Sequence, residues 1–203
     1  MIRIAKPEPR PYDSPLRAEQ VEETRARILE AAIRVMAGGI ASVSMPAIAR
    51  EAAVSVPTVY RHFGTKGELL TAVYPYVARK SGLDRLPDPT SLDDLRDSLR
   101  RIFERTDALD ELARAAMASP GGEEVRRATM PGRLARIGRW ADGLPGDLAD
   151  ADRARIARLL AVLTTSGSLR MWRDHLGVSA EQAADDIDFI VRAAVAASTR
   201  TRP

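Results

Sequence analysis

The segment from Ser44 to Leu70 constrains the fold more than any other part of the chain. It predicts a short helix, a tight turn, a second helix and the capped start of a third helix. Ser44 can accept a free backbone N–H at the start of the first helix, and Pro46 falls in the first turn, where its missing N–H costs little. Val59 and Phe63 stand four residues apart, so both face inward on the second helix. Proteins use this arrangement to present one helix to a DNA major groove.

The outer face of the second helix carries methyl groups, hydroxyls and cations, which together can read base edges and phosphates. Thr65 and Glu68 form a capping-box pattern at the start of the next helix, and Lys66 lies in its first turn. The helix dipole and the ammonium group both favour a phosphate there. The predicted DNA contacts are Ser44, Ser55, Val56, Pro57, Thr58, Tyr60, Arg61, His62 and Lys66.

The run TVYRHFGTKGELL, which ends at Leu70, resembles the signature of the TetR family of transcriptional regulators. The resemblance is good from residue 20 to residue 80 and looser over the rest of the chain. It implies an all-helical protein. It also implies that the residues matching Thr58, Tyr60, His62 and Lys66 contact operator phosphates and bases.

Two residues depart from the family pattern. Pro46 stands where many relatives carry an arginine or another polar residue that helps to hold DNA, so we expect one contact to be absent. Ala53 replaces the glycine that is usual in the turn, and it strains the backbone mildly if this position must adopt a positive φ. Together they predict a lower DNA affinity than that of a typical member.

The charge distribution points to the same region. Residues 21–80 carry eight Lys or Arg against five Asp or Glu, whereas residues 81–203 carry nineteen against twenty. Residues 1–20 carry four basic and three acidic groups, so the N-terminal arm is not a strong polycation. The excess positive charge therefore lies in the helix-turn-helix region.

Composition excludes several other classes. The chain has no cysteine, so it has no disulfide framework, thiolate zinc site or thiol nucleophile. Its first residues lack the apolar run of a secretion signal. The longest uncharged stretch of the later helices, Leu159 to Leu169, has 11 residues, whereas a membrane span needs ~20. We expect a cytoplasmic protein without a membrane partner.

An enzyme is a weak alternative. The two histidines are His62, on the presumed reading helix, and His175, alone near a helix end. Asp185 and Asp186 point to different helix faces, which makes a metal cluster improbable. No phosphate-binding loop, dinucleotide motif or nucleophile elbow occurs. We therefore predict no catalytic residues, metal or cofactor. A DNA-binding protein of low sequence specificity, without an effector, remains the other alternative.

The chain divides into a flexible N-terminal arm (residues 1–14), a helix-turn-helix domain with its connecting helix (15–80) and a larger effector-binding and dimerisation domain (81–203). Four prolines from Lys6 to Pro15 favour the extended arm. Caps and breakers predict later helices over residues 91–118, 123–128, 132–142, 150–175 and 179–197. With the four earlier helices, about nine are expected, and no strand.

Pro75 lies inside the predicted fourth helix, where a proline removes one backbone hydrogen bond. We expect a kink near Thr71 to Pro75. One hypothesis is that this kink lies on the path by which a ligand moves the DNA-reading helices. A passive kink that merely fits the packing is an equal alternative.

Small residues along the last two helices favour a four-helix dimer interface. Dimerisation also suits two-fold operators, although the same alanines could pack inside one subunit. These residues are Ala154, Ala157, Ala161, Thr164 and Ser168 on one helix and Ala183, Ala184, Ala193, Ala194 and Ala197 on the other.

The family resemblance implies an effector pocket among the middle helices. Bulky side chains there supply the candidates, although large apolar residues at helical spacing are more often simple core. The candidate ligand contacts are Phe103, Met117, Met130, Trp140, Met171 and Trp172, with Arg170 or Arg173 as a charged partner. The sequence thus predicts a homodimeric repressor that an unidentified small molecule releases from a palindromic operator.

Overall fold

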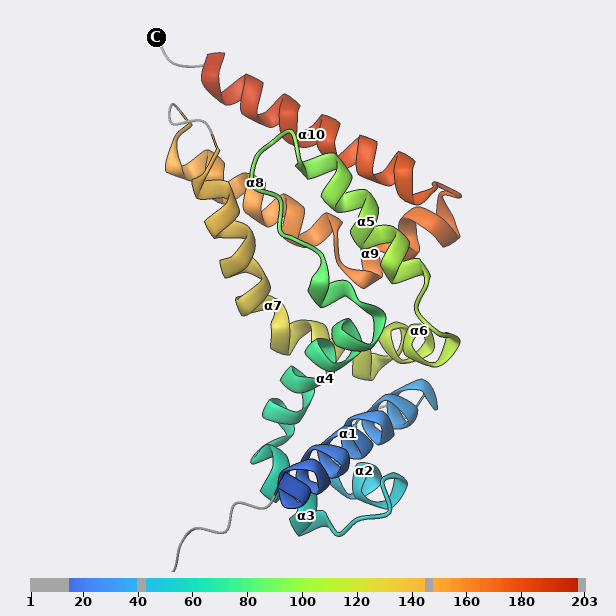
Figure 1. Cartoon of the computed structure of the whole chain (residues 1–203). Coiled ribbons are helices and arrows are strands. Elements are labelled where there is room, and N and C mark those ends of the chain that lie inside the picture. The colour runs from blue at the N-terminus through green and yellow to red at the C-terminus, as the bar shows by residue number, and fades with distance from the viewer. Residues whose placement is uncertain (1–14, 40–42, 145–147, 201–203) are drawn as a thin grey trace, which may run out of the picture.

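The computed structural model describes residues 15–39, 43–144 and 148–200 (Figure 1). The predicted arm of residues 1–14 lies outside these ranges. Within them the chain consists of α-helices, one 3-10 turn and one π turn, and no strand occurs. The all-α fold class is therefore confirmed.

Four helices form the N-terminal part, and three of them begin at a capping side chain, of which Ser44 and Thr65 were predicted. Ser44, Ser55 and Thr65 each accept the backbone N–H of the residue three positions later. Figure 1 shows the first three helices at one end of the molecule, with the fourth leading away from them. The four are α1 (Pro15–Ala37), α2 (Met45–Glu51), α3 (Val56–Phe63) and α4 (Lys66–Ser81).

The rest of the chain forms six further α-helices in the described ranges, with a 3-10 turn at Leu83–Arg85 and a π turn at Met171–His175. The last helix packs against both α5 and α8 at the end of the molecule opposite α3 (Figure 1). The six are α5 (Leu95–Asp107), α6 (Glu111–Ala118), α7 (Pro120–Asp142), α8 (Asp150–Leu163), α9 (Ser166–Arg170) and α10 (Ala180–Arg200).

The predicted helix over residues 91–118 is wrong in its extent. Asp110 accepts the backbone N–H of Ala113 at 2.8 Å, so α6 begins as a helix separate from α5. The predicted helix over residues 150–175 likewise ends at Leu163, because Thr165 accepts the N–H of Ser168 and starts α9. In both places a side-chain cap starts a new helix, although the apolar pattern of the sequence predicts one continuous helix.

The two short helices predicted over residues 123–128 and 132–142 are in fact one helix, α7, which runs through Pro131. Its first turn contains two buried glycines. A Cβ on Gly121 would lie 2.7 Å from Met36 Cγ, and one on Gly122 would lie 2.5 Å from the Met117 carbonyl oxygen. The glycines therefore allow close packing rather than a helix break. The sequence predicts about nine helices, whereas the described residues form ten α-helices.

Buried side chains form two hydrophobic cores. The N-terminal core joins α1 to α4 with α6 and the first half of α7, so it includes Met117 and Val125. The C-terminal core joins α5, α8, α10 and the end of α7 around Phe103, Ile156 and Ile187. The two cores do not divide at residue 80, because α6 packs along α1.

Candidate nucleic-acid interface and adjoining cavity

Short contacts hold α3 in place and leave its outer face free. Ser55 Oγ accepts the N–H of Thr58 at 3.2 Å and lies 2.8 Å from its hydroxyl. Val59 and Phe63 are buried in the N-terminal core. On α1, Arg25 Nη1 donates to the His62 carbonyl oxygen at 2.7 Å, and its guanidinium lies 4.2 Å from the Phe63 ring centre. Arg25 therefore pairs a cation with the C-terminal end of α3, where the helix dipole favours it.

In the turn between α2 and α3, Ala53 adopts φ 53°, so the condition under which alanine strains this turn is met. The Ala53 N–H donates to the Arg50 carbonyl oxygen at 3.2 Å, and the Val54 N–H donates to that of Ala49 at 2.9 Å. These two bonds form a Schellman motif, which needs a left-handed residue at this position. Alanine there carries the steric cost that glycine avoids.

The predicted DNA contacts lie on or beside α3. Pro57, Tyr60 and Arg61 are exposed on it, and 48% of the Tyr60 surface is accessible. Val56, Thr58 and His62 are half-buried, exposed Ser55 precedes the helix, and half-buried Ser44 caps α2. Pro46 is exposed and its side chain offers no hydrogen-bond donor, and the missing DNA contact there stays a prediction.

Burial is the main reason that the pKa of His62 lies below its ordinary value, and the nearby cations Arg61 and Arg25 add to it. Glu22 acts in the opposite direction. The imidazole is therefore neutral at neutral pH, with one N–H donor and one acceptor.

Lys66 begins α4, and the capping box predicted around it is present. Glu68 N–H donates to Thr65 Oγ1 at 3.1 Å, and Thr65 N–H donates to Glu68 Oε2 at 3.2 Å. Lys66 Nζ lies 2.6 Å from Glu124 Oε2 of α7. In this structure the lysine predicted to bind a DNA phosphate is therefore paired with a carboxylate of the following domain.

A cavity of about 330 Å³ lies where the two cores meet, bounded by α4, α5, α6, α7 and α9. A smaller chamber of about 100 Å³ adjoins it and shares Tyr74, Leu83, Ile102, Arg133, Arg136 and Thr164 with its wall. Further residues of the larger chamber include Val77, Leu109, Met117, Val125, Met130 and Leu169. The volume is at the lower end of the range for small-molecule sites.

The structure brings only some of the predicted ligand contacts to these chambers. Met117 and Met130 line the larger one, and Trp140 lines the smaller one. Phe103 does not line either; it is 1% exposed in the C-terminal core. Met171 is exposed on the π turn.

The charged partners predicted beside Met171 are also placed elsewhere. Arg170 is absent from the walls of both chambers. Arg173 pairs with Asp107 at 2.8 Å and with Asp174 at 2.6 Å, and Trp172 packs beside the C-terminal core. The break at Thr164 and Thr165 turns this segment away from the face that a continuous helix would present.

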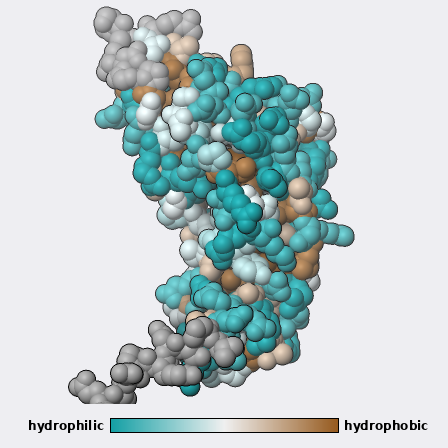
Figure 2. Space-filling view, in the orientation of Figure 1, coloured by the Kyte–Doolittle hydropathy of each residue, from teal (hydrophilic) through white to brown (hydrophobic). Residues whose placement is uncertain are grey.

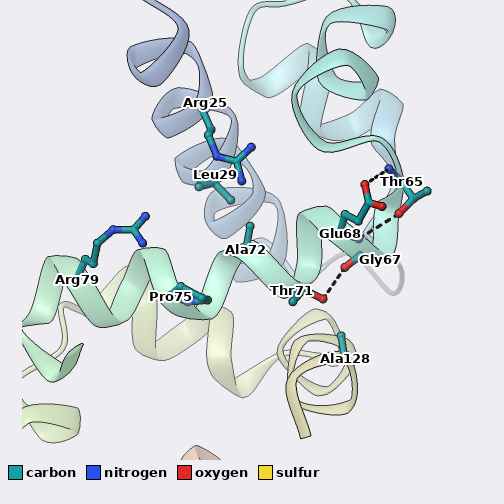
Figure 3. A pocket seen from close by; sticks show the side chains of 10 residues that line it. All are labelled: Arg25, Leu29, Thr65, Gly67, Glu68, Thr71, Ala72, Pro75, Arg79 and Ala128. Atoms are coloured by element: carbon teal, nitrogen blue, oxygen red, sulfur yellow. Dashed lines mark hydrogen bonds between the residues drawn. The ribbon is translucent and has the colours of Figure 1, made fainter. Parts of the chain in front are cut away.

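On its other side, α4 borders an open groove with α1 and α7, which Figure 3 shows from close by. Arg25 and Leu29 come from α1, and Ala128 comes from α7. Pro75 lies in the middle of α4, which continues through it. The residue thus contacts this groove and the larger chamber, whereas the predicted kink and its role stay predictions.

Two kinds of site are not found in the described residues. No group of three or more His, Asp or Glu side chains gathers as a metal site. None of the helices there combines the length and apolar run that a membrane crossing needs.

Comparison with known proteins identifies the N-terminal part. Residues 28–73 match the family described as "Bacterial regulatory proteins, tetR family", and these residues include α2, α3 and the turn between them. This part of the chain is thus a DNA-binding domain of the TetR type. Its resemblance to the HTH-type transcriptional regulator SrpR of Pseudomonas putida is 42% identity over 72 residues, covering 35% of this chain and 34% of that protein.

A second relative extends somewhat further. The HTH-type transcriptional repressor SCO4008 of Streptomyces coelicolor is 35% identical over 99 residues, covering 48% of this chain and 50% of that protein. The chain thus spans between about a third and a half of the length of these curated relatives. A solved transcriptional regulator from Rhodococcus sp. Rha1 shares the fold, with a TM-score of 0.52, 20% identity, and coverage of 88% of this chain and 99% of that chain.

Sequence reasoning identified Met117 and Met130 but missed most of the wall of the larger chamber, including its polar residues Tyr74 and Arg133. A periodic signal for Arg133 was present, because it stands four residues after Thr129 and eight after Val125, on the inner face of α7. The arginines before and after it along α7 concealed this signal. Tyr74 carried no signal beyond its place next to Pro75.

Proposed function

We propose that this chain is a sequence-specific DNA-binding repressor, released from a two-fold operator by a small-molecule effector. The observation that carries the proposal is α3, fixed by caps and by Arg25 while its polar face stays open. The named relatives are a transcriptional regulator and a transcriptional repressor, which supports the assignment.

The chemistry of the α3 face suggests how each side chain contacts DNA. Apolar Val56 and Pro57 suit thymine methyls or sugars. Thr58 and Arg61 suit base edges or phosphates, and Tyr60 suits the backbone. Ser44 and Ser55 lie at the helix starts nearest the DNA, whereas His62 and Lys66 complete the backbone contacts.

A homodimer through α8 and α10 suits the exposed apolar surface there. Phe189 of α10 is 73% exposed, and Ile190 beside it and Leu159 and Val162 of α8 are also exposed. Among the predicted small residues, Ala154, Ala193 and Ala197 are exposed as such an interface requires. Others pack inside the subunit, namely Ala157, Ala161, Ala183, Ala184 and Thr164. A two-fold dimer would place two α3 helices about 34–36 Å apart.

The effector would act through α4. This helix lines the larger chamber with Val77, and its first residue is Lys66. A ligand that binds better to one arrangement of α4 favours that arrangement, and such coupling is typically about 1–3 kcal/mol. The favoured state would be one in which the two α3 helices no longer match the half-site spacing.

Binding to DNA from immediately upstream of the protein's own gene tests the proposal. Fluorescence anisotropy at physiological salt, with excess unrelated DNA, should show tight binding by two chains or a multiple of two. Arg100→Ala, an exposed arginine paired with Glu104 on α5, is a control that should bind equally well. If competitor removes the binding and selection from random DNA enriches no two-fold sequence, the proposal is wrong and the low-specificity alternative holds.

A further inference from the structure

The larger chamber has an apolar wall that also carries arginines. Hydrophobic side chains from α4, α5, α6 and α7 line a large part of it. Arg126, Arg133 and Arg136 also contribute, whereas the described residues of this wall include no aspartate or glutamate. In this chamber a ligand therefore meets positive charge, whereas the adjoining smaller chamber also contains Asp88, which pairs with Arg136.

Two of these arginines already have partners. Arg126 Nη2 lies 2.8 Å from Glu123 Oε2, and its Nη1 donates to the Met117 carbonyl oxygen at 2.7 Å. Arg136 Nε lies 3.7 Å from Asp88 Oδ1 at the exposed edge. Neither needs an external anion for its charge.

Arg133 is different. Its Nη2 donates to the carbonyl oxygen of Thr164 at 2.8 Å and also to the Thr164 hydroxyl. Its Nε is buried without a hydrogen-bond partner, and no described carboxylate lies within ion-pair distance of its guanidinium. Burying a cation without an anion is costly, which is also why burial lowers the pKa of Arg133. Arginine nevertheless stays protonated in proteins.

Tyr74 of α4 is the second polar group at this place. It lines both chambers together with Arg133, and its hydroxyl has no hydrogen-bond partner among the described residues. A phenol can donate its O–H to a carboxylate, and a guanidinium can donate to the same group. The two residues come from different helices, α4 and α7, that pack together.

We propose that the cavity binds an organic acid, with the carboxylate accepting hydrogen bonds from Arg133 and Tyr74 and an apolar body filling the larger chamber. This inference rests on the proposed effector role of the cavity and adds the chemical class of the effector. A carboxylate supplies the anion that Arg133 lacks, and the body contacts Val77, Met117 and Val125. Because Tyr74 precedes Pro75 on α4, the bound acid ties that helix to α7.

Isothermal titration calorimetry with two matched probe series tests the inference. One series is decanoate, decanol and decylamine, and the other is 4-phenylbutanoate with its alcohol and amine. At least one of the two acids should bind about ten-fold or more tightly than its alcohol or amine, since charge-assisted hydrogen bonds are the strong ones. The inference is overturned if alcohol or amine binds as well as acid in both series, or if no probe binds.

Three variants locate the charge preference. Arg133→Met should remove the preference for acid over alcohol, whereas Arg136→Met, from the same helix and the same wall, should keep it. Tyr74→Phe keeps the ring of a partly exposed side chain, so it should fold even if Arg133→Met does not. It should weaken acid binding several-fold and leave alcohol binding unchanged; an unchanged acid affinity would contradict the assignment.

These titrations contain no DNA, so they are independent of the proposed repressor function. If the protein binds the acid but binds no operator, the organic-acid site is supported and its proposed role as an effector site is wrong. If the protein binds a specific operator but its cavity shows no preference for acids, the proposed repressor function is supported and the organic-acid inference is overturned.

Discussion

The region that presents α3 and the region that encloses the cavity are assembled from different kinds of contact. From α2 to the start of α4, Ser44, Ser55 and Thr65 each cap a helix through a residue three positions away. The cavity wall instead combines residues from Thr71 to Leu169, and Arg133 meets Thr164 across 31 positions. A local device survives changes elsewhere in the chain, whereas a wall built from distant segments changes whenever one helix shifts.

The two regions also lie at different places in the molecule. In the view of Figure 2 the outline narrows between the α1–α3 end and the larger end, and most of this face is hydrophilic. The matched family residues, 28–73, lie at the smaller end, and the cavity lies beyond them. The match thus covers the α2–turn–α3 region and, of the cavity wall, only Thr71.

The largest expected effect would break the C-terminal core. Phe103→Ala should lower the free energy of unfolding by about 3–5 kcal/mol, because it removes a fully buried ring. Urea unfolding followed by tryptophan fluorescence and by far-UV circular dichroism measures it. Since α6 and α7 take part in the N-terminal core, both probes should report one transition; two separate transitions would show that the cores are independent. Leu176→Ala, exposed after the π turn, is the control.

The next effect is on DNA affinity. Tyr60→Ala and Lys66→Ala should each weaken operator binding by about ten-fold, close to 1.4 kcal/mol, through the loss of a backbone contact. Dimerisation, measured by analytical ultracentrifugation, should not change. A variant that bound as tightly as the parent would mean that α3 and α4 are placed wrongly on the DNA.

Ala53→Gly should raise the free energy of unfolding by about 0.5–1 kcal/mol, because glycine adopts the left-handed turn without the Cβ clash. Ala52→Gly is the matched control with the opposite sign, since Ala52 is buried in a right-handed conformation. Urea denaturation compares the free energies of unfolding of the two variants. Equal losses of stability in both would show that alanine does not strain the turn.

Glu124→Gln should strengthen operator binding by a few-fold, because it frees Lys66 from its 2.6 Å ion pair. The change is small since exposed pairs contribute about 0–1 kcal/mol. Anisotropy measures it, and Glu123→Gln, which touches Arg126 instead, should have no effect. Weaker binding by Glu124→Gln would contradict competition between the carboxylate and DNA.

The smallest effect concerns pH. Burial lowers the pKa of His62 in the free protein, whereas a DNA phosphate would raise it in the complex. Binding then takes up protons, so operator affinity should increase modestly as pH falls from neutral toward the ordinary histidine pKa. The dependence of operator affinity on pH should disappear in His62→Gln and persist in His175→Gln. If it remained in His62→Gln, His62 would be excluded as its source.

The difference between the two regions also explains what the sequence could predict. The caps at Ser44 and Thr65 depend on neighbours within a few residues, so they were predicted correctly, whereas the cap at Ser55 was not predicted and the positive φ of Ala53 was given only as a condition. Pro131 inside α7 and the cap at Asp110 were missed, because both depend on which of two local preferences the surrounding packing favours.

The candidate ligand contacts show the same limit of local reasoning. Phe103 and Met117 look alike in sequence as bulky apolar residues, but one lies in the C-terminal core and the other on the cavity wall. Arg133 is one of several arginines of α7, and only the break after α8 brings Thr164 to it. Whether such a residue lies in a core or on the cavity wall depends on how distant segments pack together.

The Lys66–Glu124 pair also bears on how binding responds to salt. A free lysine that meets a phosphate releases a condensed cation from the DNA, and each such contact contributes about −0.9 to the slope of log affinity against log salt. If Lys66 exchanges Glu124 for a phosphate, the freed carboxylate attracts cations from solution and offsets part of that release. On the proposed function, Lys66 would then add to operator affinity while adding less to its salt dependence than an unpaired lysine.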